Sequence, residues 1–180
     1  MQESPTRPRP AFRRILRWPT LAALVLAVAT AYDLTAGVDL AQIVAASALV
    51  YLGSAAIGNS RAAWPVFLAT FVVIGAAKAA GADGTWVLLA LAVPFALYGL
   101  ARRHDITVQG AAMLAFGAVA VLALLVDETV GGCLVAAGLL AHTAWDIKHF
   151  RENRVVVRSM SEFCMVLDTV LALAVLAVTF

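Results

Sequence analysis

The sequence is organised around the stretch Ala141–His149, which reads AHTAWDIKH. It contains two of the three histidines of the chain, and His142, Asp146 and His149 follow one another at spacings of four and three residues. Successive residues of an α-helix are rotated by about 100°. These three side chains therefore share one narrow face of a helix, while Lys148 points the other way. The stretch presents a stripe of groups that can bind protons or metal ions.

A second polar face follows in the next apolar run. Ser161, Cys164 and Asp168 recur there at helical spacing, after a short loop-like segment centred near Val155. Helices joined by a short loop commonly pack as antiparallel neighbours, so we expect the two polar faces to meet. The expected facing pairs are His142 with Asp168, Asp146 with Cys164, and His149 with Ser161.

The composition is that of a membrane protein. The 180 residues are 63% hydrophobic and 13% charged, whereas soluble domains have about 45–50% apolar and about 25% charged residues. A transmembrane helix needs about 20 mainly apolar residues, so the chain can hold seven short crossings and no separate soluble domain. We expect an all-α polytopic membrane helix bundle of seven transmembrane helices over residues 19–180. The apolar runs lie approximately at residues 20–37, 40–58, 64–80, 85–101, 110–126, 130–149 and 162–180.

The basic residues predict the orientation of these helices. Of the 13 lysines and arginines, all but Lys78 lie in the amino-terminal arm or beside connections that fall on one side of the expected bundle. The positive-inside rule then places the amino terminus in the cytoplasm and the carboxyl terminus outside, in a multi-pass protein of a bacterial inner membrane. Residues 1–18, rich in proline and arginine, are expected to form a disordered basic cytoplasmic arm against anionic lipid. Residues 29–31 resemble a signal-peptidase site, but a polytopic chain usually keeps its first helix.

Partners other than lipid are not indicated. The net charge of +2 does not predict nucleic-acid binding, because the basic residues lie between apolar runs rather than on one folded face. The positions of several arginines, Arg102 among them, are explained by the membrane topology. These arginines are also suited to bind an anionic lipid headgroup. Cys133 and Cys164 are expected too far apart to pair. The sequence does not indicate an oligomeric state.

Metal binding is the sharpest interpretation of the polar stripe. Ionisable residues inside a membrane are costly and usually functional, and His142 and Asp168 each lie about 10 Å from the expected helix ends at 1.5 Å per residue. Imidazole and carboxylate ligands suit zinc or non-haem iron. We therefore expect a divalent metal held by His142, Asp146, His149 and Asp168.

The function that follows is a metal-dependent hydrolase or oxidase acting on a lipid, an isoprenoid or another apolar substrate, with Glu162 or His104 transferring protons. Two alternatives stay open. A small proton- or ion-coupled transporter needs polar groups at several depths, and the middle of the expected bundle offers little beyond Tyr51 and Thr70. A structural or assembly subunit would use the same stripe as a buried polar network between helices.

The last 40 or so residues resemble a family of small bacterial integral-membrane proteins of unassigned function. Its signature pairs a His-x2-Trp-Asp-x2-His segment with a Ser-x2-Cys-x3-Asp segment. Members often carry a further histidine where this chain has Phe150. The expected architecture is also similar to that of seven-helix zinc hydrolases of the ceramidase and adiponectin-receptor type, whose histidine spacing is not reproduced. The matching residues are His142, Trp145, Asp146 and His149, then Ser161, Cys164 and Asp168.

Overall fold

The computed structural model of this chain describes residues 17–32 and 34–180. Asp33 and most of the arm expected at residues 1–18 lie outside these ranges. Every regular element in the described residues is helical, as the composition predicts, and none of these residues forms a strand. The elements are α1 (Trp18–Ala31), η2 (Gly37–Leu40), α2 (Ala41–Ile57), η3 (Ser60–Ala62), α3 (Ala63–Ala79), α4 (Gly84–Ala101), α5 (Thr107–Leu125), α6 (Glu128–Glu152) and α7 (Arg158–Thr179).

Local capping residues set several helix boundaries. The Asp83 carboxylate accepts a hydrogen bond from the Thr85 backbone N–H at 2.7 Å, and the Asp127 carboxylate accepts one from the Val130 N–H at 3.0 Å. These bonds satisfy N–H groups that have no partner in the first turns of α4 and α6. At the carboxyl end of α2, Gly58 adopts the left-handed conformation at φ 70°. A residue without Cβ adopts this conformation at little cost.

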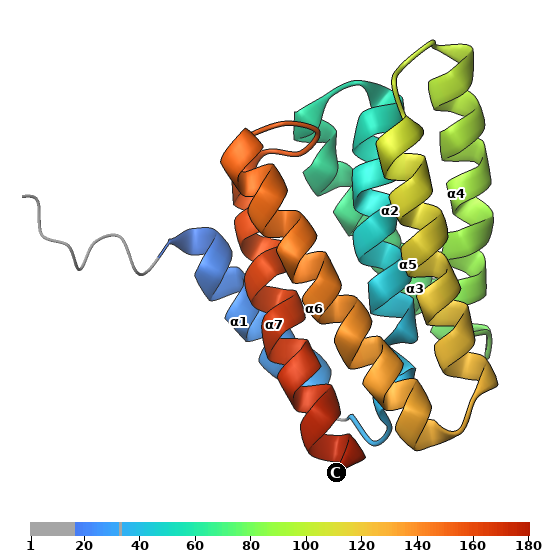
Figure 1. Cartoon of the computed structure of the whole chain (residues 1–180), viewed down its shortest axis with the longest axis vertical. Helices are drawn as coiled ribbons and strands as arrows, with labels where there is room; N and C mark the ends of the chain where they lie inside the picture. Colours follow the sequence, from blue (N-terminus) through green and yellow to red (C-terminus); the bar gives the residue numbers. More distant parts are fainter. Residues whose placement is uncertain (1–16, 33) are drawn as a thin grey trace, which may run out of the picture.

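The last two helices form the expected antiparallel hairpin (Figure 1). Asn153 ends α6 in the left-handed conformation at φ 51°, and Val155 is also left-handed at φ 70°. The turn therefore lies where the sequence predicts it. Deeper in the hairpin, the hydroxyl oxygens of Thr143 and Thr169 are 3.3 Å apart and link α6 to α7.

Six helical segments within the described residues are long and apolar enough to cross a membrane, and this indicates a membrane protein. The exception is α1, which has 14 residues and is therefore about 21 Å long, against about 30 Å of hydrocarbon. The expected first run does not continue as one helix, because Ala36 is extended before the 3-10 turn that starts at Gly37. A seventh crossing and the placement of the two termini stay predictions.

The second helix lies at the centre of the bundle, which the sequence did not indicate. Of its span, 78% is buried, against at most 44% for the other five. Small residues explain this position, since they allow neighbouring backbones to approach closely in lipid. A Cβ added at Gly53, for example, would lie 2.9 Å from a methyl group of Val66 on α3. The short α1 packs outside the bundle proper, against α7 (Figure 1).

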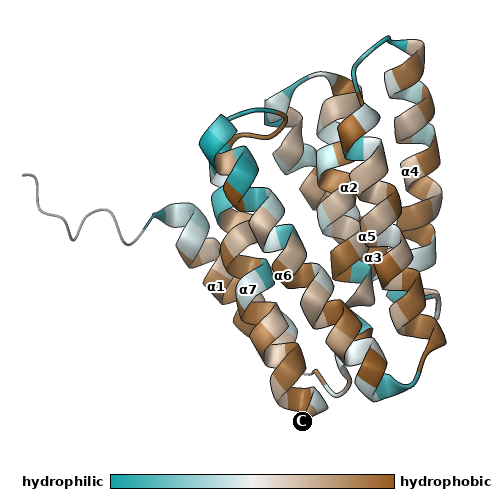
Figure 2. Cartoon of the chain, in the orientation of Figure 1, coloured by the Kyte–Doolittle hydropathy of each residue, from teal (hydrophilic) through white to brown (hydrophobic). Residues whose placement is uncertain are grey.

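Most of the basic residues gather at one end of the bundle. The connections at residues 58–62, 102–106 and 153–157 all lie at the upper end in Figure 1, which Figure 2 shows to be hydrophilic, most clearly around α6 and α7. We call it the basic end, since it carries Arg61, Arg102, Arg103 and Arg154. The distribution of charge is the one expected, and its assignment to the cytoplasm stays a prediction from the positive-inside rule.

Candidate metal centre

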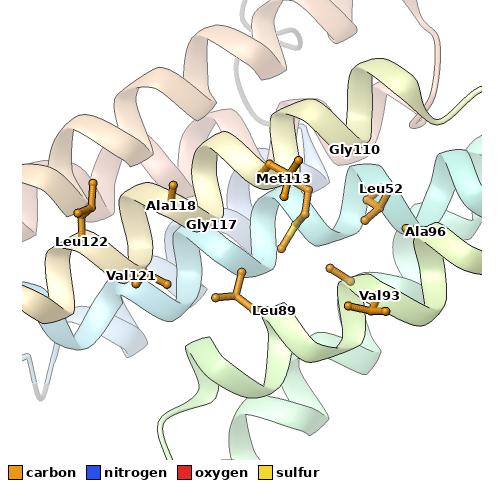
Figure 3. Close-up of a pocket in the computed structure, with 12 residues that line it drawn as sticks. Leu52, Leu89, Val93, Ala96, Gly110, Met113, Gly117, Ala118, Val121 and Leu122 are labelled. Atoms are coloured by element: carbon orange, nitrogen blue, oxygen red, sulfur yellow. The ribbon is translucent and has the colours of Figure 1, made fainter.

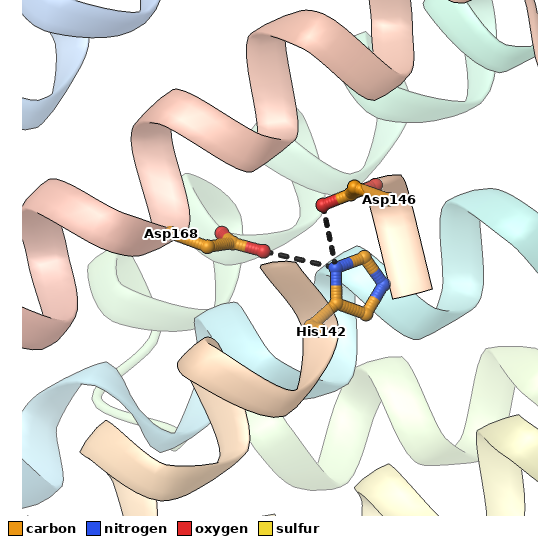
Figure 4. Close-up of side chains that lie close together, drawn as sticks. All are labelled: His142, Asp146 and Asp168. Carbon is orange, nitrogen blue, oxygen red and sulfur yellow. Dashed lines mark hydrogen bonds and ion pairs between the residues drawn. The ribbon is translucent and has the colours of Figure 1, made fainter. Parts of the chain in front are cut away.

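Three expected ligands come together inside the bundle (Figure 4). The Nδ1 atom of His142 lies 3.2 Å from Oδ2 of Asp146 and 2.9 Å from Oδ2 of Asp168. None of the three side chains has any exposed surface. One donor atom from each lies within 4.8 Å of the others. The prediction that His142 faces Asp168 across the hairpin is confirmed.

Helical spacing and close packing position these groups. His142 and Asp146 are one turn apart on α6, and the hairpin places Asp168 of α7 beside them. One turn before His142, Gly138 lets α6 approach two neighbours. A Cβ at Gly138 would be 3.2 Å from methyl groups of Val44 on α2 and Val119 on α5.

Two hydroxyl groups of α2 donate hydrogen bonds to the second oxygen of each carboxylate. Tyr51 donates to Oδ1 of Asp146 at 2.6 Å, and Ser47 donates to Oδ1 of Asp168 at 3.4 Å. The Tyr51 oxygen is also 3.2 Å from the hydroxyl of Ser161 on α7. Each carboxylate therefore turns one oxygen to the imidazole and one to α2. Groups that orient ligand residues in this way are typical of metal sites in proteins.

The role of α2 in this site was not predicted from the sequence. Its only signal is that Ser47 and Tyr51, both on an apolar helix, are four residues apart and so share a face. Tyr51 was noted only as an isolated polar group. Its ring also lies between both histidines of α6, with centroids 5.4 Å from His142 and 4.7 Å from His149.

The fourth expected ligand does not join the group. His149 is buried, but its Nδ1 lies 2.9 Å from the carbonyl oxygen of Trp145, and its Nε2 lies 3.3 Å from Nε2 of Gln109 on α5. With Nδ1 donating to the carbonyl, Nε2 accepts from the glutamine amide. Both nitrogens are thus engaged elsewhere. The expected partner of His149, Ser161, contacts Tyr51 instead.

The two residues expected to transfer protons also lie outside the group. Glu162 accepts hydrogen bonds from Arg17 at 3.1 Å and from Thr20 at 2.9 Å, and so ties α1 to α7. Nδ1 of His104 lies 2.7 Å from the carbonyl oxygen of Ala56 in the last turn of α2. These contacts give both residues a structural task, and their roles in proton transfer stay predictions.

The remaining expectations concern Cys164 and Lys78. Cys164 is buried, with its thiol 3.6 Å from the sulfur of Met160, and it forms no disulfide with Cys133. Lys78 lines a polar pocket away from the basic end, together with Asp39.

The distances from Nδ1 of His142 to the two aspartate oxygens are close to those between ligands of one ion. Zinc bonds to nitrogen and oxygen of about 2.0–2.2 Å place two ligands about 3–3.5 Å apart, and the separations here are 2.9 and 3.2 Å. The other imidazole nitrogen, Nε2 of His142, points away from both aspartates (Figure 4) and has no hydrogen-bond partner among the described residues. The group could therefore hold a metal ion through Nδ1.

Comparison with protein-family models, with curated proteins and with solved structures gives no match for this chain. The resemblance to a family of small bacterial membrane proteins stays a prediction. The fold and the site themselves define the class: a helical membrane protein with a buried histidine–aspartate cluster that could bind a metal ion.

Proposed function

We propose that this protein is an integral-membrane metalloprotein that holds a divalent ion, zinc or iron, between His142, Asp146 and Asp168. The observation that carries the proposal is the convergence of one imidazole and two carboxylates, all without exposed surface, in an apolar bundle. Imidazole nitrogen and carboxylate oxygen are ligands that both metals accept.

Charge balance supports a divalent ion. Two ionised carboxylates buried in the bundle would be very costly without a counter-charge. A protonated His142 alone would leave one negative charge. A divalent ion bound by Asp146, Asp168 and a neutral His142 leaves none.

We place the site in a membrane enzyme that acts on a lipid or another apolar substrate, on the cytoplasmic side of a bacterial inner membrane. A bound metal supplies a Lewis acid that polarises a water or a substrate oxygen. The chain's own residues hold and orient that acid. Asp146 and Asp168 balance the charge of the metal ion. Hydrogen bonds from Tyr51 and Ser47 keep the two aspartate carboxylates turned toward that ion.

Proton binding is the second candidate, and it too rests on a specific observation. Nδ1 of His142 lies within hydrogen-bond distance of both carboxylates, so a His142 protonated on both nitrogens, beside one protonated and one ionised aspartate, would also make the site neutral. The series of hydrogen-bonded side chains from Ser47 through the cluster to Tyr51 and Ser161 would then carry protons in a proton-coupled transporter.

The test is elemental analysis of the protein freshly purified in mild detergent. Wild type should contain about one zinc or iron per chain, since the site offers a single set of ligands. His142→Ala and Asp168→Asn should lose the metal. His104→Ala and Glu162→Gln, which alter a histidine and an acid outside the group, should keep it.

Absence of metal from fresh wild type, or equal metal in all four variants, would refute the metalloprotein. Proton-coupled uptake in vesicles then separates the remaining possibilities. Uptake that depends on Asp168 supports the transporter. A purely structural network predicts no uptake and a similar stability when His142 and Asp168 are replaced by apolar residues of like size.

A further inference from the structure

An apolar groove opens on the outside of the bundle between α4 and α5 (Figure 3). Its volume is about 710 Å³. Leu89 and Val93 of α4 face Met113 and Val121 of α5 across it, and Leu52 of α2 lies behind them as its floor. The residues that line it have only hydrocarbon or thioether side chains, so a ligand bound there would have to be apolar.

The groove faces lipid along its length. Val93 is 57% exposed and Leu114 is 77% exposed, whereas Met113 at the bottom is buried. Along α5 the lining runs from Gly110 to Leu122, which at 1.5 Å per residue is about 18 Å. That is slightly more than one leaflet of a hydrocarbon core about 30 Å thick.

Positive charge lies at one end of this groove. Gly110 is in the first turn of α5, directly below the connection at residues 102–106. Arg102 and Arg103 in that connection are both exposed. The one acid of the connection, Asp105, has a carboxylate oxygen engaged by the backbone N–H of Thr107. An anionic headgroup at the membrane surface would therefore lie near the positive charge of this connection, where the Arg102 guanidinium lies 6.0 Å from the centroid of the Tyr98 ring.

We propose that this groove binds the acyl chains of an anionic phospholipid, whose phosphate lies at the connection that carries Arg102 and Arg103. Size favours an acyl chain over a helix of a second copy. A helix is at least about 10 Å across, so an 18 Å segment takes up about 1,400 Å³, twice the volume of the groove. A hydrocarbon chain with van der Waals contacts of about 4 Å on each side takes up about 300 Å³ over that length, so the two chains of one phospholipid take up about 600 Å³ and fit the groove.

The groove also adjoins the candidate metal centre. Leu52 and Gly117 line the groove, and the residues before them, Tyr51 and Phe116, contact the ring of His142, with centroids 5.4 and 5.1 Å from it. The groove and the imidazole thus contact adjacent faces of the same two helices, α2 and α5. If the proposed enzyme is correct, the lipid in this groove belongs to its substrate class; lipid binding itself does not depend on the metal.

The test measures lipid retained by the purified protein. Wild type is reconstituted in bilayers of equal parts phosphatidylglycerol and phosphatidylcholine, extracted in mild detergent and analysed by native mass spectrometry. We expect phosphatidylglycerol to be retained. Ala118→Phe, which fills the groove, should lower retention about tenfold. Ala115→Phe on the same helix, outside the lining, should not.

A second pair of variants tests the headgroup contact. Arg102→Gln with Arg103→Gln should lower retention of phosphatidylglycerol about thirtyfold, since each arginine near a membrane surface contributes about fivefold. Arg151→Gln with Arg154→Gln, at the same end of the bundle, should leave it unchanged. The metal content of the same samples shows whether the metal site is lost independently of lipid binding.

Three results would overturn the proposal. Equal retention of phosphatidylglycerol and phosphatidylcholine would refute the contact with an anionic headgroup. Unchanged retention of phosphatidylglycerol in Ala118→Phe would refute the groove as the lipid-binding site. A lipid-free dimer that Ala118→Phe dissociates and Ala115→Phe does not would assign the groove to a second copy of the chain.

Discussion

Replacing Tyr51 by phenylalanine tests whether α2 orients the metal centre. The substitution removes one oxygen atom and keeps the ring that packs between the two histidines of α6. The hydrogen bond it removes, 2.6 Å to Oδ1 of Asp146, is buried. Because Asp146 has no exposed surface, water does not readily replace the lost donor.

The expected loss follows from this geometry. A buried hydrogen bond to a charged group contributes about 1.5–3 kcal/mol, and Ser161 loses a partner as well. If the carboxylate is oriented for a metal, the affinity for zinc should fall by about ten- to a hundredfold. Competition with a chromophoric chelator in detergent measures this affinity, and thermal unfolding without metal reports any loss of stability.

The matched control is Tyr98→Phe, because Tyr98 is half exposed on α4 and has no contact with the cluster among the described residues. It should leave the zinc affinity of wild type unchanged. An unchanged affinity in Tyr51→Phe, with zinc still bound, would refute the idea that this hydroxyl orients a metal ligand. A loss of stability with no change in affinity would make Tyr51 a packing residue only.

Two further predictions concern packing and topology. Gly131→Ala should destabilise the bundle by about 1–3 kcal/mol, because its Cβ would lie 2.5 Å from the backbone oxygen of Ala123. Gly75→Ala, where a Cβ meets nothing within 4 Å, should stabilise by about 0.5–1 kcal/mol, and unfolding in detergent compares the two. In cells, a membrane-impermeant thiol reagent should label Asp127→Cys from outside and Arg154→Cys only after lysis, in a Cys133→Ser background. Labelling in the reverse order would contradict the assignment of the basic end to the cytoplasm.

The sequence alone determined the features that depend on composition and on neighbours along the chain. A high apolar content predicts a helical membrane bundle. The spacing of His142 and Asp146 places them on one face of a helix, and the short loop near Val155 brings Asp168 opposite them. These relations span at most one hairpin, so helical periodicity was enough to predict them.

The tertiary structure decided which distant helices complete the site. Tyr51 lies 95 residues from Asp146, and Gln109 lies 40 residues from His149. Periodicity shows which face of a helix is polar, but it does not show which neighbour that face meets. In lipid, that choice follows from how closely backbones approach at small residues. Packing of this kind put α2 at the centre, brought its hydroxyls to the two aspartates and turned His149 toward α5.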